Sequence, residues 1–305
     1  MKSPASLFRG LTLKVRPDYL LGPHTTFKIG GPAQYMVNVN DAQALCDLIG
    51  RLNGEGVPFR VLGGGSNILV DDAGISGAVI SMGGRLKEIY IREGLLEVGA
   101  GLRLPALLRE TADLGFSGLE HLAGIPGTAG GAVRMNAGGR ERAIGDAVQS
   151  VTCVLNAGQL ETIPRNACGF GYRTSAFADK IVLSASLKLD EEDRKVIVEN
   201  MAKVLAAKKL SQPLGSLSAG CVFKNPPAAK SAGQLIQEAG LVGESVGGAF
   251  VSAKHANYII NREGAAFDDV LGLIEKVRSR VQDVFAVRLE LEIEIWSDRE
   301  SLRKS

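Results

Sequence analysis

Glycine is concentrated in two segments of this chain, and their positions constrain the fold more than any other feature of the sequence. The first segment reads VLGGGSNILV over residues 61–70, and the second reads GIPGTAGGA over residues 124–132, followed by NAG at 136–138. The chain holds 38 glycines in 305 residues, well above the usual share of about 7%. Because glycine adopts positive φ and lets a backbone approach a ligand closely, both segments indicate structured binding loops.

The first segment predicts a strand, a tight glycine turn and a second strand. Such a turn points consecutive N–H groups into one concavity, which suits a pyrophosphate. Neither segment matches GxGxxG, and neither has the lysine of a P-loop. The alternative is that both are glycine turns packed against a core, although two such segments together favour a ligand. We expect residues 118–145 to form an irregular loop, because so much glycine disfavours a helix.

Composition excludes several classes of function. Lys plus Arg (35) nearly balances Asp plus Glu (33), so neither a nucleic-acid nor a membrane-surface partner is expected. No segment has the roughly 20 apolar residues of a membrane span, and the N-terminus lacks the apolar core of a secretory signal. We therefore expect a cytoplasmic protein with free thiols and no metal site, because its cysteines form no CxxC pair. They are Cys46, Cys153, Cys168 and Cys221.

Hydrophobic periodicity predicts short strands mixed with amphipathic helices, an α+β class. Helices are expected from about residue 41 to 52, from 104 to 115 and from 268 to 285. Strands are expected at 60–62, running directly into Gly63, and at 289–296. A charged stretch at 190–195 leads into a helix that ends at Lys209, and this region is the best candidate for a domain boundary.

Three segments resemble the FAD-binding domain of the UDP-N-acetylenolpyruvoylglucosamine reductase family: TTFKIGGPA at 25–33, the segment at 63–70, and residues 118–138. The resemblance covers nearly the whole chain. It implies the vanillyl-alcohol-oxidase (PCMH) type of FAD-binding fold, spanning about residues 28–190. The implied domains are a first FAD-binding subdomain (1–70), a second (71–208) and an α+β substrate-binding domain (209–305).

The resemblance also assigns cofactor-binding residues. The FAD pyrophosphate would be held by Gly63, Gly64, Gly65, Ser66 and Asn67, with Gly127, Thr128 and Ala132 along the flavin. Many oxidases of the broader fold attach flavin covalently through a histidine in this turn. Ser66 stands at the comparable point here, so non-covalent FAD is expected.

The segment GYRTS at 171–175 resembles the family's YR-x-S motif. Arg173 would bind and polarise a substrate carboxylate, because its guanidinium is a planar and permanently charged fork. Tyr172 would contact the substrate. For an arginine taken alone, a surface ion pair is the ordinary alternative.

The segment SAGCVFKNP at 218–226 resembles the part of the family that carries the general acid. The family commonly has serine where this chain has Cys221. A thiol has a pKa of about 8.5, so it is mostly protonated at neutral pH and can donate a proton. Taken alone, Cys221 fits an inert, buried small side chain equally well.

The closing strand brings in a carboxyl group. Alternation places Glu290, Glu292 and Glu294 on one face, and periodicity does not choose between them. The resemblance selects Glu292 as the carboxyl that assists protonation; the alternative is a solvated acidic edge strand.

The resemblance adds substrate-binding residues and a subtype. The substrate contacts it implies are Lys209, Lys224, Asn225 and His255, although helix capping and packing would explain some of them. The stretch between Arg173 and Lys209 is short, which resembles the compact subtype without a substrate-covering loop.

The implied activity is NADPH-dependent reduction of UDP-N-acetylglucosamine enolpyruvate to UDP-N-acetylmuramate through FAD, in peptidoglycan precursor synthesis, by a monomer. One alternative is an FAD-dependent sugar or alcohol oxidase of the same fold, which has no reason to combine Cys221, Arg173 and Glu292. A second is a non-catalytic protein that binds FAD or a UDP-sugar.

Overall fold

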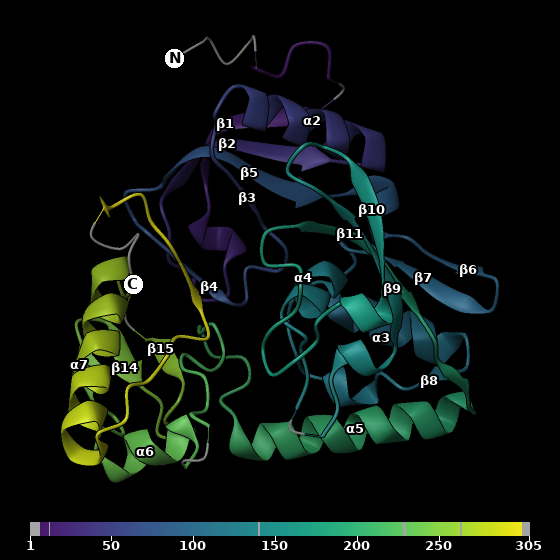
Figure 1. Ribbon diagram of the computed structural model, residues 1–305. Coiled ribbons are helices and arrows are strands. Elements are labelled where there is room, and N and C mark those ends of the chain that lie inside the picture. The colour runs from purple at the N-terminus through teal and green to yellow at the C-terminus, as the bar shows by residue number, and fades with distance from the viewer. Residues whose placement is uncertain (1–6, 12, 140, 228–229, 263, 301–305) are drawn as a thin grey trace. The chain divides into compact units, whose positions relative to one another are not determined.

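The computed structural model describes residues 7–11, 13–139, 141–227, 230–262 and 264–300 (Figure 1). Helices and strands are mixed along the chain, which confirms the predicted α+β class. The described residues pack into two compact units, each made of three chain segments. Unit 1 comprises residues 1–17, 35–64 and 77–207, and unit 2 comprises residues 18–34, 65–76 and 208–305.

Two sheets form the framework of unit 1. The first has the order β1-β2-β5-β3, and its β3 and β5 are parallel. The second has the order β10-β9-β11-β7-β6 and is antiparallel throughout. Three strands of the first sheet, β1, β2 and β5, run on into the segments that belong to unit 2. The strands are β1 (Lys14–Leu20), β2 (Pro32–Val39), β3 (Phe59–Val61), β5 (Ile75–Met82), β6 (Ile89–Arg92), β7 (Leu95–Gly99), β9 (Val148–Val154), β10 (Leu160–Pro164) and β11 (Ile181–Leu187).

The helices of unit 1 follow the predicted periodicity where their sequences are amphipathic. Helix α2 (Ala42–Gly54) begins at Asp41, whose carboxylate accepts the N–H of Ala44 at 2.9 Å, a standard N-cap. Helix α3 (Leu104–Asp113) begins with a proline in its first turn, where no hydrogen bond is lost. Both predictions are confirmed. Helix α5 (Arg194–Ser211) follows a short pair of strands, β8 (Phe116–Ser117) and β12 (Asp190–Glu191), and continues past the boundary between the units.

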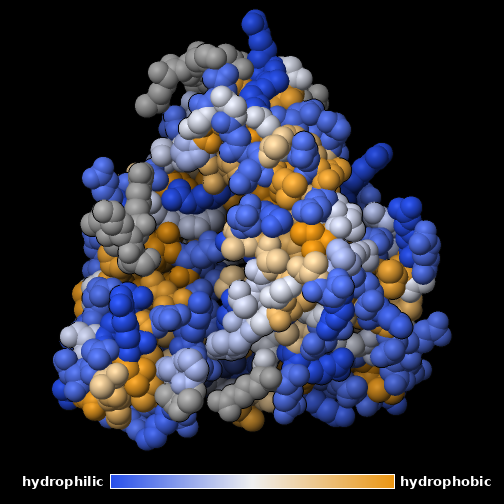
Figure 2. All heavy atoms as spheres, in the orientation of Figure 1, coloured by the Kyte–Doolittle hydropathy of each residue, from blue (hydrophilic) through white to orange (hydrophobic). Residues whose placement is uncertain are grey.

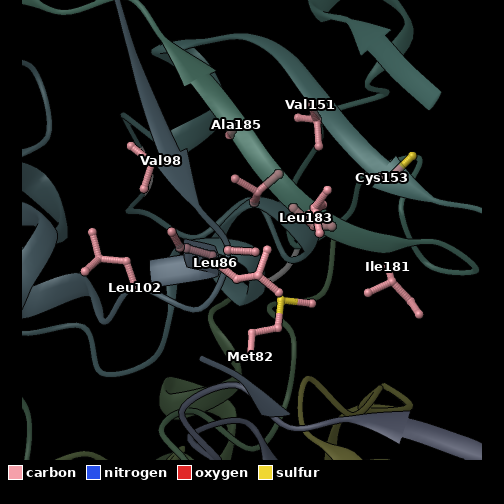
Figure 3. Packing of buried hydrophobic residues seen from close by; sticks show 14 of the residues in the cluster. Met82, Leu86, Val98, Leu102, Val151, Cys153, Ile181, Leu183 and Ala185 are labelled. Atoms are coloured by element: carbon pink, nitrogen blue, oxygen red, sulfur yellow. The ribbon is translucent and has the colours of Figure 1, made fainter. Parts of the chain in front are cut away.

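The apolar core of unit 1 is formed by side chains from both sheets and from helices α2 and α3. Figure 3 shows part of this core, with labelled side chains from β7, β9 and β11 together with Met82 at the end of β5 and Leu102 after β7. Two of the four cysteines, Cys153 and Cys168, are buried in this core as free thiols. Burial raises the pKa of both thiols, so they behave as small apolar side chains.

One prediction for unit 1 is wrong. The glycine-rich stretch 118–145 contains the short helix α4 (Ala129–Arg134), which was expected to be irregular. Thr128 caps it by accepting the N–H of Gly131 at 3.4 Å. A Cβ on Gly130 would lie 2.6 Å from the Cβ of Ala100. The close approach to Ala100 leaves no room for a side chain at position 130. This tertiary contact outweighs the low helix propensity of glycine.

Unit 2 surrounds a separate apolar core that is formed largely by two helices and short strands. Helix α7 buries Val270, Leu273, Ile274, Val277 and Val281 at i, i+3, i+4 spacing, as predicted. Helix α6 begins with a capping box in which Ser231 and Gln234 exchange hydrogen bonds. The elements are β4 (Ile68–Val70), α6 (Ala232–Glu238), β13 (Ser245–Val246), β14 (Ala249–Val251), β15 (Ile259–Asn261), α7 (Phe267–Phe285) and β16 (Glu294–Trp296).

Strand β4 pairs in parallel with β16, which joins segments far apart in sequence. The predicted closing strand at 289–296 is therefore only partly right, because regular pairing covers Glu294–Trp296 and residues 289–293 form an isolated bridge at Leu291. The three-domain division stays a prediction. The packing adds that residues 18–34 and 65–76 associate with the C-terminal segment.

Polar and apolar side chains are interspersed on the face of the molecule seen in Figure 2. Among the described residues, no helix combines the length and the apolar character that crossing a membrane requires.

Candidate active site

The two glycine segments meet within unit 1. A Cβ added to Gly64 would lie 2.5 Å from the Cα of Gly127, and one added to Gly63 would lie 2.6 Å from the Oγ1 of Thr128. Gly127 is fixed in turn, because its carbonyl accepts the N–H of Leu104 at the start of α3, at 3.1 Å. The backbones of the two segments therefore touch, which no side chain larger than glycine would allow.

This contact leaves backbone donors available. Within the described part of the chain, the N–H groups of Gly63, Gly64, Gly127 and Thr128 donate to no protein acceptor. Adjacent backbone N–H groups form a concavity that suits anionic oxygen. The residues present therefore fit a pyrophosphate group, as the FAD expectation requires. Ala132, also predicted to line the flavin, is 5% exposed and packs in the core of unit 1.

The rest of the first glycine turn belongs to unit 2. Gly65 has φ +64°, and a Cβ there would lie 2.2 Å from the carbonyl oxygen of His24, so only glycine fits. Its carbonyl accepts the N–H of Thr26 at 2.9 Å. Ser66 and Asn67 follow and are half-buried. The segment TTFKIGG, singled out by the resemblance, thus contacts the glycine turn directly.

Arg173 lies in a tight loop of unit 1. It has φ +54°, and its guanidinium donates to the carbonyl of Gly138 at 3.1 Å while lying 5.6 Å from the centre of the Tyr172 ring. Asn136 holds the loop by donating to the carbonyl of Gly171 at 2.9 Å and accepting the N–H of Gly145 at 3.0 Å. The arginine is thereby attached to the end of the second glycine segment.

Cys221 is half-buried in unit 2 and lies on a segment that pairs on both sides. One side bridges to Tyr258, and there the N–H of Val222 donates to the carbonyl of Asn257 at 2.8 Å. On the other side, the N–H of Glu292 donates to the carbonyl of Val222, also at 2.8 Å. The predicted proton donor and the predicted carboxyl residue thus lie on adjacent, hydrogen-bonded segments of one unit.

Glu292 is also tied to the cofactor turn. Asn67 donates from Nδ2 to the carbonyl of Glu292 at 3.0 Å, and the carbonyl of Asn67 accepts the N–H of Glu294 at 2.9 Å. Glu290 instead lies 3.8 Å from Lys224 and is mostly exposed. Glu292 therefore bonds through its backbone both to the Cys221 segment and to Asn67, and its selection over Glu290 and Glu294 stays a prediction.

The predicted substrate-binding residues of unit 2 have structural contacts. Asn225 accepts the N–H of Ala232 at 3.0 Å, at the start of α6, and the carbonyl of Lys209 accepts a hydrogen bond from Lys254. Burial lowers the pKa of His255, so its ring is neutral at pH 7, and its Nδ1 accepts the N–H of Asn257 at 3.3 Å. Their substrate roles stay predictions.

Two asparagines that the sequence did not single out shape the site. Asn136 fixes the Arg173 loop, and Asn257 fixes the Cys221 segment through two side-chain hydrogen bonds. Both lie in segments that the resemblance covers, but their roles were not predicted, because an amide that binds backbone groups leaves no periodic pattern. Between Arg173 and Lys209 the chain forms β11, β12 and α5.

Comparison with known proteins now gives this arrangement a class. A model of an FAD binding domain matches residues 33–164, which contain both glycine segments. The model of the UDP-N-acetylenolpyruvoylglucosamine reductase C-terminal domain matches residues 212–296, which contain Cys221 and Glu292. Arg173 and Lys209 lie outside both ranges. The class is that of proteins in which an FAD binding domain precedes this C-terminal domain.

Similarity to whole proteins identifies the family. The chain is 41% identical over 300 residues to UDP-N-acetylenolpyruvoylglucosamine reductase from Carboxydothermus hydrogenoformans, covering 96% of this chain and 99% of the relative. It is 40% identical over 293 residues to the reductase of Heliobacterium modesticaldum, covering 95% and 92% respectively. The chain belongs to the UDP-N-acetylenolpyruvoylglucosamine reductase family, so the predicted family is confirmed.

A solved structure gives the same result for the fold. The crystal structure of the UDP-N-acetylenolpyruvylglucosamine reductase from Thermus caldophilus superposes with a TM-score of 0.80 at 42% identity, covering 93% of this chain and all of that one. The predicted fold class, an FAD-binding region followed by an α+β C-terminal domain, is confirmed.

Proposed function

We propose that this protein reduces UDP-N-acetylglucosamine enolpyruvate to UDP-N-acetylmuramate with FAD as bound cofactor and NADPH as reductant, in peptidoglycan precursor synthesis. Family membership over nearly the whole chain supports this proposal. The observation that supports it most is the backbone pairing of the Cys221 segment with Glu292, since the predicted proton donor and the predicted carboxyl residue then lie on adjacent segments.

The residues of unit 1 are proposed to bind the FAD pyrophosphate and the substrate carboxylate. The N–H groups of Gly63, Gly64, Gly127 and Thr128 would donate to the FAD pyrophosphate, for which glycine leaves room. Arg173, fixed by the Gly138 carbonyl, would bind the substrate carboxylate and stabilise the negative charge that develops when hydride adds.

When bound, FAD supplies a carrier that accepts hydride from NADPH and passes it to the enolpyruvyl methylene carbon. In unit 2 the Sγ–H bond of Cys221 would break as its proton passes to the neighbouring carbon. The resulting thiolate would take up a proton from solvent after product release. Glu292 would assist protonation, and Lys209, Lys224, Asn225, His255 and Tyr172 would contact the sugar nucleotide.

The alternative activity that the sequence allowed was that of an FAD-dependent sugar or alcohol oxidase of the same fold. Family membership favours the reductase over this oxidase. The compact subtype is part of the proposal, because β11, β12 and α5 account for the chain between Arg173 and Lys209. The proposal also places the enzyme in the cytoplasm as a monomer with non-covalent FAD, serving cell-wall growth, cell shape and division, and without nucleic-acid or membrane partners.

One assay tests the proposal. Purified protein loaded with FAD is mixed with NADPH and the enolpyruvyl sugar nucleotide, and NADPH absorbance is followed, with oxygen consumption measured in parallel. Substrate-dependent loss of NADPH with formation of UDP-N-acetylmuramate is expected. No substrate-dependent loss would contradict the proposal, and oxygen uptake with a sugar or alcohol in the absence of NADPH would establish the oxidase instead.

A further inference from the structure

Asn257 is a buried amide whose polar groups all serve the Cys221 segment and its surroundings. Asn257 as a whole is 3% exposed. Oδ1 accepts the N–H of Phe223 at 2.9 Å, and Nδ2 donates to the carbonyl of Phe223 at 2.8 Å. Its own carbonyl accepts the N–H of Val222 at 2.8 Å, and its N–H donates to Nδ1 of His255 at 3.3 Å.

The side-chain bonds of Asn257 take the place of backbone pairing beside Phe223, since the Cys221 segment and the Tyr258 segment pair only at one isolated bridge. The backbone at Asn257 turns, because the N–H of Tyr258 donates to the carbonyl of His255 at 2.9 Å. Regular pairing therefore stops beside Val222, and the amide of Asn257 supplies the donor and the acceptor that a further strand residue would have offered to Phe223. Phe223 is 1% exposed, so water does not replace this amide without cost.

The opposite edge of the same segment faces the residues around Glu292. The N–H of Lys224 donates to the carbonyl of Glu290 at 2.9 Å, and the N–H of Glu292 donates to the carbonyl of Val222 at 2.8 Å. The Cys221 segment is thus the middle one of three. The side chain of Asn257 bonds to one edge of this segment, and the opposite edge of the segment bonds to the backbone of Glu292.

We propose that Asn257 is a positioning residue that holds the thiol of Cys221 and the backbone of Glu292 in the geometry needed for proton delivery. This inference rests on the proposed function. It assigns no proton transfer to Asn257, which acts through the backbone of Phe223. Proton transfer to carbon depends steeply on donor placement, and a shift of about 1 Å can cost about 100-fold in rate.

A second buried asparagine in the same unit provides a matched control. Asn261 is 7% exposed; its Nδ2 donates to the carbonyl of Phe27 at 2.9 Å, and its Oδ1 accepts the N–H of Ala265 at 2.8 Å. Asn257→Ala and Asn261→Ala therefore each remove one buried amide and its two hydrogen bonds to backbone groups. Only the first loosens the Cys221 segment.

The experiment uses full-length, FAD-loaded protein and measures flavin reduction by NADPH separately from flavin reoxidation by the enolpyruvyl sugar nucleotide, with thermal unfolding alongside. Asn257→Ala is expected to slow reoxidation by at least about tenfold, to leave reduction by NADPH within about twofold, and to raise the solvent deuterium isotope effect on reoxidation. Asn261→Ala is expected to lower the unfolding midpoint similarly without slowing reoxidation.

Asn257→Ser serves as the second variant, because it leaves room for a water molecule that can bridge to Phe223, and an intermediate reoxidation rate is expected. Equal slowing of reoxidation by Asn257→Ala and Asn261→Ala, or no slowing in either Asn257 variant, would overturn the inference. Failure of the wild-type protein to turn over would instead overturn the proposed function.

Discussion

Asn67 donates a hydrogen bond of 3.0 Å from Nδ2 to the carbonyl oxygen of Glu292. One residue of the predicted pyrophosphate turn is thereby fixed to the backbone of the predicted catalytic carboxyl residue, although 225 positions separate them in sequence. The carbonyl of Asn67 also accepts the N–H of Glu294 at 2.9 Å, just before β4 and β16 begin to pair. Asn67, in the part of the turn that belongs to unit 2, is thus joined to the carboxyl segment within that unit.

Asn67→Ala is expected to act on the carboxyl segment as well as on the cofactor. Loss of the bond to Glu292 should lower the free energy of unfolding by about 1 kcal/mol and slow flavin reoxidation by the substrate. Chemical denaturation and rapid-mixing kinetics measure the two effects. Asn38→Ala is a suitable control, since Asn38 makes one comparable bond of 3.0 Å to Ser81 in unit 1. Reoxidation as fast as in the wild type would refute the coupling.

Gly64→Ala is expected to force the two glycine segments apart. The new Cβ would lie 2.5 Å from the Cα of Gly127, and backbone cannot move aside as a side chain does. We expect a loss of about 1–3 kcal/mol in stability and a lower content of bound FAD, measured by visible absorbance of the purified protein.

Gly54→Ala gives the comparison for that variant. Gly54 ends α2, and a Cβ there meets nothing within 4 Å, so this variant should keep its FAD and gain up to about 1 kcal/mol. Full FAD content in Gly64→Ala would show that the two segments do not need their close contact.

The carboxyl group of Asp71 makes stability depend on pH. Burial opposes its ionisation, but hydrogen bonds from Ser297 Oγ (2.6 Å), the N–H of Ala73 and Arg299 outweigh burial and lower its pKa. The residue is 1% exposed. A carboxyl whose pKa is lower in the folded state stabilises the fold above its unfolded pKa of about 3.9, and this contribution disappears as pH falls through the lower, folded pKa.

Asp71→Asn tests this dependence. At pH 7 it should lower the free energy of unfolding by about 1–3 kcal/mol, because hydrogen bonds to charged groups are of that size. The difference from the wild type should narrow below about pH 4, where the unfolded carboxyl is protonated. Urea denaturation at several pH values measures it, and a difference that stays constant down to low pH would exclude the ionised carboxyl as its source.

Helices and strands whose residues show a clear local pattern could be predicted from the sequence. Helix α2 has an acceptor at Asp41 and buried apolar residues on one face, and both features are visible in a window of about a dozen residues. Helix α4 was missed because its glycines indicate a loop, whereas the contact of Gly130 with Ala100 decides their conformation. The closing strand was drawn too long, because alternation persists in Leu289–Ile293 where regular pairing does not.

Contacts between distant segments could not be predicted from the residues. The parallel pairing of β4 with β16 and the bonds of Asn257 to Phe223 arise from tertiary packing. The family resemblance, in contrast, selected Glu292 from three equivalent glutamates. Glu292 and Glu294 both bond to Asn67 through their backbones, so that selection stays a prediction. The substrate-binding roles stay predictions, as do those of Arg173 and Cys221.

The rate at which substrate reoxidises the reduced flavin in Cys221→Ala tests the central claim most directly. The variant should be reduced by NADPH nearly as fast as the wild type but reoxidised about 100-fold more slowly or worse, since a positioned acid contributes about 10²–10⁴-fold. Cys46→Ala, which removes another partly exposed thiol, should match the wild type in both steps. Equal slowing of reduction and reoxidation in Cys221→Ala, or no slowing of reoxidation, would contradict the assignment of Cys221 as proton donor.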